Sequence, residues 1–265
     1  MACQRVGYES TKATGSMALI FSHGNAKLTK RLIFSLPAGS TCPGALECFS
    51  RAVVDSSTGK RSIQDGPHTV FRCFAASSEV QYDAVYVNRQ ANFKAIVGAL
   101  NTGNCAALIN SEIQKNRRKN TKIVRIHESG DFFSAAYLLA WLLVAKANPD
   151  LKFYAYSKNL PLFVNLELPS NFYLTASYGG KFDYLIDEGK FTRYSKVFMS
   201  PEDAELAGLP VDHDDSHCFE DGPFALLVHG TQPKGSAWGK AIRARRSAGH
   251  FGGYSKATRA QLVTA

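Results

Sequence analysis

Residues 122–149, KIVRIHESGD followed by FFSAAYLLAWLLVAKANP, decide the fold class because they read as a strand that leads directly into a helix. The first part is a β-branched run that ends in a polar, glycine-containing turn, which is typical of a buried strand. The second part carries apolar residues at helical spacing, with Ser134 near its start and Asn148-Pro149 at its end as boundary signals. Together they predict one β-α unit of a parallel sheet.

The same alternation continues to the end of the chain. Further strands are predicted over residues 151–159, 171–180, 194–200 and 224–230, with a short helix or turn over 160–168 and a helix over 181–190. Strands that alternate with helices indicate parallel β-α units. We therefore predict an α/β fold, in which the strands form a partial or complete parallel (β/α) barrel within a single domain.

The first part of the chain is less regular. Residues 1–17 are rich in Ser, Thr and Gly, and we expect them to form a flexible arm before a single barrel-like domain over 18–265. Within that domain we predict a strand over 31–39 and one long helix over 77–101. A chain of 265 residues that is 45% apolar can bury a large core.

The charge balance favours a partner that carries phosphate. The chain has 31 basic and 22 acidic residues, and the excess of positive charge gathers in 114–122 and 234–250. We predict that these stretches bind nucleic acid through Arg117, Arg118, Arg243, Arg245 and Arg246. The alternative, which we weight equally, is that they are solvated helix ends.

We expect a cytoplasmic protein with no membrane partner. No run of about 18 or more apolar residues occurs, and the start of the chain lacks the layout of a secretory signal. Thiols stay reduced in the cytoplasm, where a cluster of cysteines more often binds metal than forms disulfides.

Three of the six cysteines are candidates for a metal centre in the first half of the domain. Cys42 and Cys48 flank a Pro-Gly turn, and Cys73 follows after a gap of 24 residues. Three thiolates can hold an iron-sulfur cluster with one open iron, or a zinc ion with one open position. The spacing fits neither paired zinc hooks nor the short cysteine triplet of known cluster enzymes, so both metals stay open. The remaining ligand position is open, or is filled by His217 or Cys218.

Polar residues stand at the ends of the predicted strands, where the loops of parallel sheets converge into active sites. From these strand ends we predict catalytic roles for Glu128, Asp131 and His229, and cofactor-binding roles for Ser129, Lys158, Ser177 and Gln232. Asp131 has an equal alternative, which is to cap the helix that begins near Ser134. Regular alternation would place Arg125, His127 and Ser129 on one face of their strand.

One acidic segment and the absence of several catalytic motifs exclude further classes of function. The segment 211–222, VDHDDSHCFEDG, is interpreted as a hydrated acidic loop in preference to a divalent-cation site. No G-x-S-x-G elbow, H-E-x-x-H helix or H-x-E with P-C-x-x-C is present, which argues against serine hydrolases, zincins and zinc deaminases.

Six blocks of sequence resemble the phage gene product 88 family over about residues 17–245. They are FSHGNAKLTK (21–30), FSLPAGSTCPGALEC (34–48), GPHTVFRCFAASSEVQYDAVYVNRQANF (66–93), RIHESGDFFS (125–134), FYAYSKNLP (153–161) and FALLVHGTQPKGS (224–236). This resemblance implies a phage protein in the host cytoplasm, and the family name by itself implies no activity.

A more distant likeness concerns the Cys-Pro opening, the CFA triplet and SGDF, which look like segments of mobile-element proteins related to radical S-adenosylmethionine barrels. That likeness implies that Cys42, Cys48 and Cys73 hold a [4Fe-4S] cluster whose open iron accepts the amino and carboxylate groups of S-adenosylmethionine. The gaps between the cysteines depart from the usual triplet of that class.

The leading hypothesis is thus an iron-sulfur enzyme that acts on a nucleotide or nucleic acid, with S-adenosylmethionine as a candidate cofactor. The alternative is a basic nucleic-acid-binding module with a structural metal site.

Overall fold

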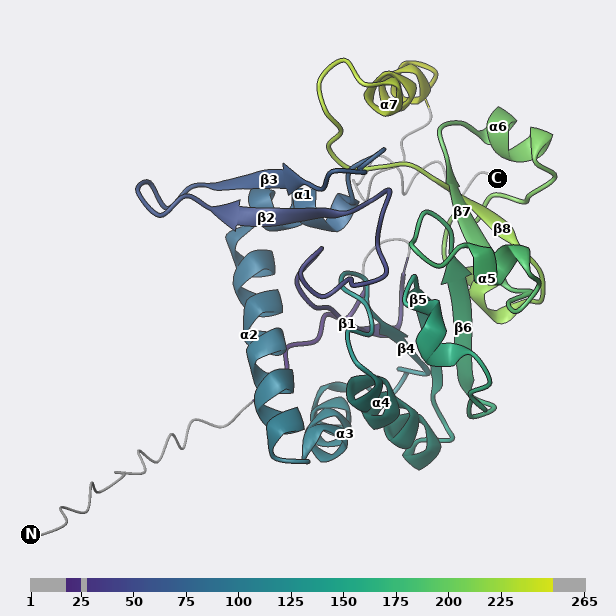
Figure 1. The fold of residues 1–265 in the computed structure, drawn as a ribbon. Helices are drawn as coiled ribbons and strands as arrows, with labels where there is room; N and C mark the ends of the chain where they lie inside the picture. The colour runs from purple at the N-terminus through teal and green to yellow at the C-terminus, as the bar shows by residue number, and fades with distance from the viewer. Residues whose placement is uncertain (1–17, 25–27, 250–265) are drawn as a thin grey trace, which may run out of the picture.

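Six parallel strands form the central sheet of the computed structural model, which describes residues 18–24 and 28–249 (Figure 1). The predicted arm over 1–17 lies outside the described residues. The strands stand in the order β1 (Arg31–Phe34), β4 (Ile123–Ile126), β5 (Lys152–Ser157), β6 (Phe172–Ser177), β7 (Tyr194–Phe198) and β8 (Phe224–Leu227). The α/β class and these parallel strands were predicted from the alternation and are confirmed.

The sheet is open. Its strands follow one another in chain order, and β1 and β8 do not pair with each other within the described residues, so the predicted complete barrel is not found. Other backbone covers each edge, through a bridge from Ser22 to Ile33 and one from Val211 to Ala225. Right-handed connections between parallel strands in sequential order run over one face only, which leaves the other face to the loops.

The helices include α3 (Cys105–Asn116), α4 (Ala135–Ala147), α5 (Tyr184–Asp187), α6 (Pro201–Leu206) and α7 (Ala237–Ser247), with short 3-10 turns η1 (Leu160–Phe163) and η2 (Ser216–Phe219). The Ser134 hydroxyl caps α4 by accepting from Tyr137 N–H, as its sequence predicts. None of the described helices has the length and apolar character needed to span a membrane.

A two-stranded antiparallel hairpin, β2 (Ser50–Val54) with β3 (Arg61–Asp65), projects beside the sheet and is absent from the sequence-based prediction (Figure 1). Its strands are short and mostly polar, and its faces are largely exposed. A hydrophobic alternation therefore does not mark them.

The main core lies between one face of the sheet and helices α2 (Asp83–Asn101), α3 and α4. Alternate strand residues such as Phe34, Ile126 and Phe153 point to this side. Because successive side chains along a strand point to opposite faces, Arg125 and Tyr154 lie on the other face. That second face is polar and aromatic, and it borders the cavity described below.

The end of β4 departs from regular alternation. His127 has a left-handed backbone with φ 68°, and the N–H groups of His127 and Glu128 both donate to Phe34 O. This bulge turns the His127 side chain into the core, where it packs on Phe132 and Tyr137. The expectation that His127 shares a face with Arg125 is therefore wrong.

The predicted single helix over 77–101 is also wrong, because the chain breaks at Tyr82 into α1 (Phe74–Gln81) and α2. Tyr82 has an extended backbone with φ −123° and ψ 115°. The break allows Arg89 on α2 to reach Glu79 on α1, with Arg89 Nη1 donating to Glu79 Oε1 at 3.0 Å. On a straight helix these two residues would be about 15 Å apart along the axis.

The Glu79–Arg89 ion pair is almost completely buried, since 1% of Glu79 and 5% of Arg89 is exposed. Glu79 Oε1 also accepts from Ala38 N–H at 2.8 Å, and Arg89 Nη1 also donates to Ala75 O. The pair therefore joins α1, α2 and the loop that follows β1. Burial raises the pKa of Glu79, and the Ala38 N–H and Arg89 partly offset that rise.

Replacing Arg89 by alanine should strand the buried Glu79 carboxylate and lower the free energy of unfolding by about 3–5 kcal/mol. Arg117→Ala is the matched control, because Arg117 pairs with Asp150 in a much more exposed setting. Loss of that pair should cost about 0.5 kcal/mol or less. Urea denaturation measures both values. Equal costs for the two variants would mean that the buried pair does not hold α1 in place.

Candidate functional site

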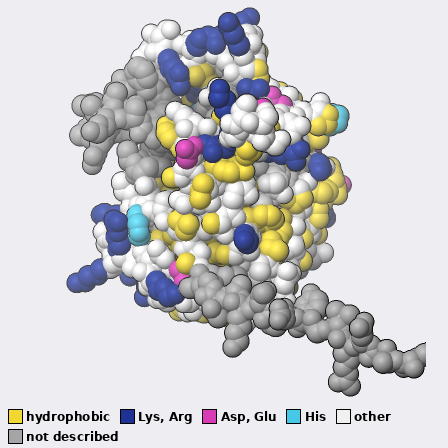
Figure 2. Space-filling model, turned by 90° about the vertical axis from the view of Figure 1, so that its left-hand side faces the viewer, with side chains coloured by type: hydrophobic (Ala, Val, Ile, Leu, Met, Phe, Trp, Pro, Cys, Tyr) yellow, Lys and Arg dark blue, Asp and Glu magenta, His cyan; other side chains and the backbone are white. Residues whose placement is uncertain are grey.

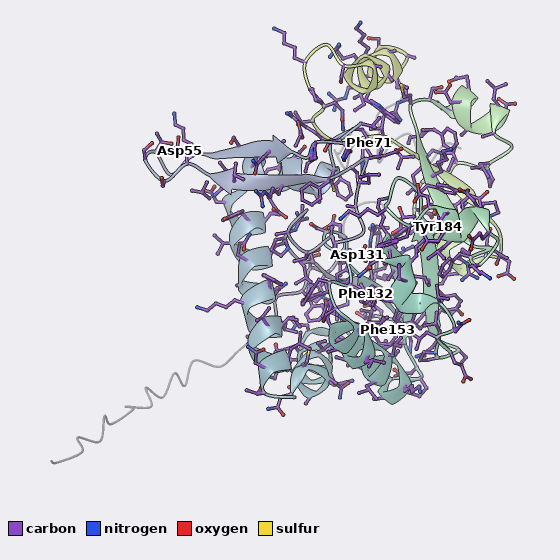
Figure 3. All side chains as sticks on the ribbon, in the orientation of Figure 1. Asp55, Phe71, Asp131, Phe132, Phe153 and Tyr184 are labelled. Carbon is purple, nitrogen blue, oxygen red and sulfur yellow. The ribbon has the colours of Figure 1, made fainter. Side chains whose placement is uncertain are left out.

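One cavity of about 590 Å³ lies at the carboxyl ends of the parallel strands. Residues from β4, β5, β6, β7 and β8 or the loops directly after them line it, together with the loop after β1, the start of α1 and the loop before η2. Ten sequence-predicted site residues share this lining: Cys42, Cys48, Cys73, Glu128, Ser129, Asp131, Lys158, Ser177, His229 and Arg245. In Figure 3 Asp131 lies between Phe71, another lining residue, and the core residues Phe132 and Phe153.

Close backbone contacts hold the loop that carries Cys42 and Cys48 against the strand ends. A Cβ atom on Gly44 would lie 2.2 Å from Lys158 O, so only glycine permits this approach. Lys181 N–H donates to Gly44 O at 2.9 Å, and Ala45 forms a bridge with Gly180. The Pro-Gly turn between the two cysteines therefore seats the loop on the ends of β5 and β6.

Cys73 reaches the cavity from the start of α1, where it is the N-cap residue. The preceding residue, Arg72, is held at its backbone by Gln232, whose Oε1 accepts from Arg72 N–H and whose Nε2 donates to Arg72 O. Gln232 is outside the cavity lining. Gln232, predicted to bind a cofactor, therefore holds the backbone next to Cys73 in place.

The three cysteines influence one another electrostatically. Burial, then Asp131 and the other two thiols, raise the pKa of Cys42 well above its ordinary value. Burial and Cys48 raise the pKa of Cys73 to about 11, and burial raises the pKa of Cys48 although Lys158 opposes that rise. Without a nearby metal these groups are neutral thiols at neutral pH.

The three thiols line one cavity without forming a preformed metal site. Within residues 18–24 and 28–249, no three His, Cys, Asp or Glu side chains are placed to hold one metal ion. In a cluster each thiolate binds a different iron, so the sulfurs surround a volume and need not meet at one point. The choice between zinc and a cluster therefore stays a matter for metal analysis.

Asp131 lines the cavity as a hydrogen-bond acceptor and does not cap α4. It accepts hydrogen bonds from Ser157 Oγ at 2.7 Å, Lys158 N–H at 2.9 Å and Phe132 N–H at 2.7 Å. Burial raises its pKa, and these hydrogen bonds oppose the rise. The capping alternative is therefore wrong, since Ser134 performs that role. Asp131 instead ties the end of β4 to the end of β5.

Lys158 and Ser177, both predicted to bind a cofactor, contact each other, because Lys158 Nζ donates to Ser177 Oγ at 2.7 Å and to Tyr178 O. This places an ammonium group at the ends of β5 and β6, near Cys48. On the other wall the His229 ring packs against Phe74, with ring centroids 4.3 Å apart. Glu128 lies 3.8 Å from Arg89, between its Oε2 and Nη2.

Sequence reasoning missed a second polar group on the inner face of the sheet. Arg125 Nη1 donates to Asp215 Oδ2 at 2.7 Å, and the hydroxyls of Tyr154 and Tyr156 donate to the same carboxylate. Asp215 is therefore largely buried, and the interpretation of its segment as a hydrated loop is wrong at this residue. The sequence does contain a sign of this group, because Arg125 interrupts the β-branched run KIVRI and a buried cation needs an acidic partner.

The two residues considered as a further metal ligand lie outside the cavity lining. Cys218 is buried, and its thiol donates to Tyr156 OH at 2.9 Å. His217 Nδ1 lies 3.5 Å from Asp212 Oδ1. Neither faces the three cysteines across the cavity, so an open position fits the arrangement better.

The two basic stretches lie at opposite ends of the molecule, because α7 is at the top and the end of α3 at the bottom of Figure 1. Figure 2 shows Lys and Arg gathered at the top, where α7 lies. Arg243 and Arg246 are exposed on α7, while Arg245 lines the cavity and donates to Val228 O. Arg117 and Arg118 lie at the far end, outside the cavity lining.

Comparison with known proteins places the chain in a family. A segment of 43 residues is 51% identical to the Gene 88 protein of Mycobacterium phage L5 and covers 16% of this chain and 18% of that relative. The Gene 88 protein of Mycobacterium phage D29 is 42% identical over 43 residues, with the same coverage. No solved structure matches, and the likeness to radical S-adenosylmethionine barrels gains no support. The family model of Gene product 88 matches residues 17–250, so the chain belongs to the Gene product 88 family.

Proposed function

We propose that the protein is an iron-sulfur enzyme that binds its cluster through Cys42, Cys48 and Cys73 and acts on a nucleotide or nucleic acid. The observation that carries this proposal is that the thiols of two segments, the loop with Cys42 and Cys48 and the start of α1 with Cys73, line the same cavity as the polar strand ends. The cavity is within the range of about 300–1,000 Å³ that is typical of ligand pockets. It therefore has room for an organic ligand beside an inorganic centre.

The raised thiol pKa values set the cost that a metal bound at the cysteines would have to offset. The pKa of each of the three thiols is raised, first by burial and then in part by neighbouring thiols or carboxylates. Iron favours the thiolate form, so binding would release protons and offset this rise. A bound cluster would supply an electron or a Lewis-acidic iron.

The chain's own residues would orient the substrate around that centre. Lys158 holds an ammonium group at the ends of β5 and β6, and Asp131, Glu128 and His229 provide groups that can exchange protons. The sequential order of the parallel strands is compatible with an incomplete (β/α) barrel, and S-adenosylmethionine is a candidate cofactor. A cytoplasmic location would keep the thiols reduced.

Anaerobic purification followed by iron and sulfide analysis tests the proposal. The protein should be coloured and hold several irons per chain, and replacing Cys42, Cys48 and Cys73 together by alanine should abolish both the visible absorbance and the bound iron. Cys105→Ala is the control, since Cys105 is buried in the core away from the cavity and should leave iron content unchanged.

If the triple variant still holds its iron, these cysteines are not the ligands. One tightly held zinc per chain, with no iron, would overturn the cluster and favour the alternative of a nucleic-acid-binding module with a structural metal site.

Iron loading should rise with pH, because each cysteine that binds iron must lose a proton and all three pKa values are raised. Below the thiol pKa values, affinity should fall about tenfold per thiol for each unit by which the pH falls. Lys158 lowers the pKa of Cys48, so Lys158→Gln should move the loading curve to higher pH. Anaerobic titration of iron and sulfide from about pH 6 to 9 measures both curves. A loading curve independent of pH would contradict a thiolate site.

A second candidate function, nucleic-acid binding at α7, rests on the exposed cations of that helix beside the cavity. Replacing Arg243 and Arg246 by glutamine should reduce the slope of log affinity against log salt by about 0.7–0.9 per charge. Arg117→Gln with Arg118→Gln is the charge-matched control at the opposite end of the molecule. Filter binding of a short RNA or DNA across salt concentrations measures the slope. If both double variants give the same slope, α7 does not bind nucleic acid specifically and is only a solvated helix.

A further inference from the structure

We propose that a row of exposed cations on α7, formed by Lys240, Arg243 and Arg246, binds the phosphates of a single-stranded nucleic acid, one nucleotide of which enters the cavity. This inference deepens the proposed function, on which it rests for a nucleotide as the substrate. It names that substrate as an unpaired nucleotide within a strand, in place of a free nucleotide. The three residues are called the α7 row below.

The α7 row follows one side of the helix. Its members are three residues apart, so each step advances about 4.5 Å along the helix axis, and neighbouring Cβ atoms lie about 5–6 Å apart. The other exposed residues of α7, which are Ala237, Ala244 and Ser247, are small. The row therefore spreads its positive charges along a line and leaves room beside them for the backbone of a strand.

The charge of the α7 row fits a linear chain of phosphates. Residues 222–249 contain no Asp or Glu, so no carboxylate of this segment neutralises the row, and Figure 2 shows Lys and Arg gathered where α7 lies. A nucleic-acid strand carries one negative charge per phosphate, at a spacing of the same order as that of the row. A single free phosphate would pair with one member and leave the others without a counter-ion.

The opposite side of α7 is used to hold the helix on the wall of the cavity. Trp238 packs on Phe71, a lining residue, with ring centroids 4.8 Å apart. Ile242 is buried in the same cluster as Phe71 and Val228. A basic helix that binds a membrane places its apolar side among the lipids. Because that side of α7 is covered, the row favours a nucleic acid over a lipid surface.

The α7 row lies within about one helix diameter of the cavity. Arg245, which directly precedes Arg246, lines the cavity and donates to Val228 O at the end of β8. A helix with its side chains is about 10–12 Å across, which one strand spans with two or three nucleotides. A strand held by the row can therefore place one of its nucleotides in the cavity of about 590 Å³.

The nucleotide that enters must be unpaired. A base within a duplex is paired and stacked, and it reaches an enclosed site only if it is turned out of the helix at a cost in free energy. A base in a single strand has no partner to lose. The combination of a row of cations and an adjacent cavity therefore selects single strands over duplexes, which a row of cations alone would not do.

Fluorescence anisotropy of the anaerobically purified protein with labelled RNA and DNA single strands of about 12 nucleotides, and with the matching duplexes, tests the inference. At least one single strand should bind about tenfold or more tightly than its duplex. Replacing the α7 row by three glutamines should weaken binding and reduce the slope of log affinity against log salt by about 2, at about 0.7 per charge.

The charge-matched control replaces Arg118, Lys119 and Lys122 by glutamine. These exposed cations follow α3 at the opposite end of the molecule, so the slope should not change. Leu226→Trp tests the cavity separately, because Leu226 lines it from β8 and a larger side chain would fill the space for the nucleotide. This variant should lose the preference for single strands and keep the salt slope. Thermal melting checks that each variant is folded.

The inference is overturned if neither single strand binds, if duplexes bind as tightly as single strands, or if Leu226→Trp keeps the preference. Equal loss of slope in the variant of the α7 row and in its control would overturn it too, as would binding to phosphatidylserine vesicles in place of single strands. Iron analysis separates these results from the proposed function. Iron bound without a preference for single strands would keep the cluster and remove the strand site, whereas the preference without iron would do the reverse.

Discussion

The buried ion pair between Glu79 and Arg89 is the constraint on which the site depends. Removing two charges from water is costly, so the pair is stable only while Ala38 N–H and Ala75 O complete its hydrogen bonds. Those bonds fix the start of α1, which carries Cys73, against the loop that carries the other two cysteines. Because one acceptor oxygen holds both segments, the three sulfurs reach the same cavity although 24 residues separate Cys48 from Cys73.

The topology explains why a cavity exists there at all. A sheet wound in one direction has helices on one face only, so loops must cover the other face. Here the cysteine loop, the start of α1 and the segment before η2 do so, and they meet at the carboxyl ends of the strands. Asp215 neutralises Arg125 on this face, which makes it possible to bury a cation within the sheet. The face of the sheet that borders the cavity can therefore carry polar side chains and still be buried.

The order of apolar and polar residues along the chain was enough to predict the strands and the edge of the sheet where they end. The strands from β4 to β8 follow from β-branched runs, and the convergence of Asp131, Lys158 and Ser177 follows because parallel strands end at one edge. The break at Tyr82 has no proline or glycine to mark it, since it arises from the distant pairing of Glu79 with Arg89. The bulge at His127 depends on two N–H groups that share Phe34 O. Asp212, another residue of the cavity lining, was missed because its burial comes from pairing beside β8, which composition does not reveal.

The charged groups of the cavity differ from one part of its wall to another. At the cysteines the thiols are neutral, and burial makes their deprotonation costly, so a cation bound there would have to offset that cost. Lys158 and Asp131 lie among the groups that line the same cavity. Its wall therefore combines thiols, a carboxylate and an ammonium group, a set of groups that a single nonspecific basic surface would lack.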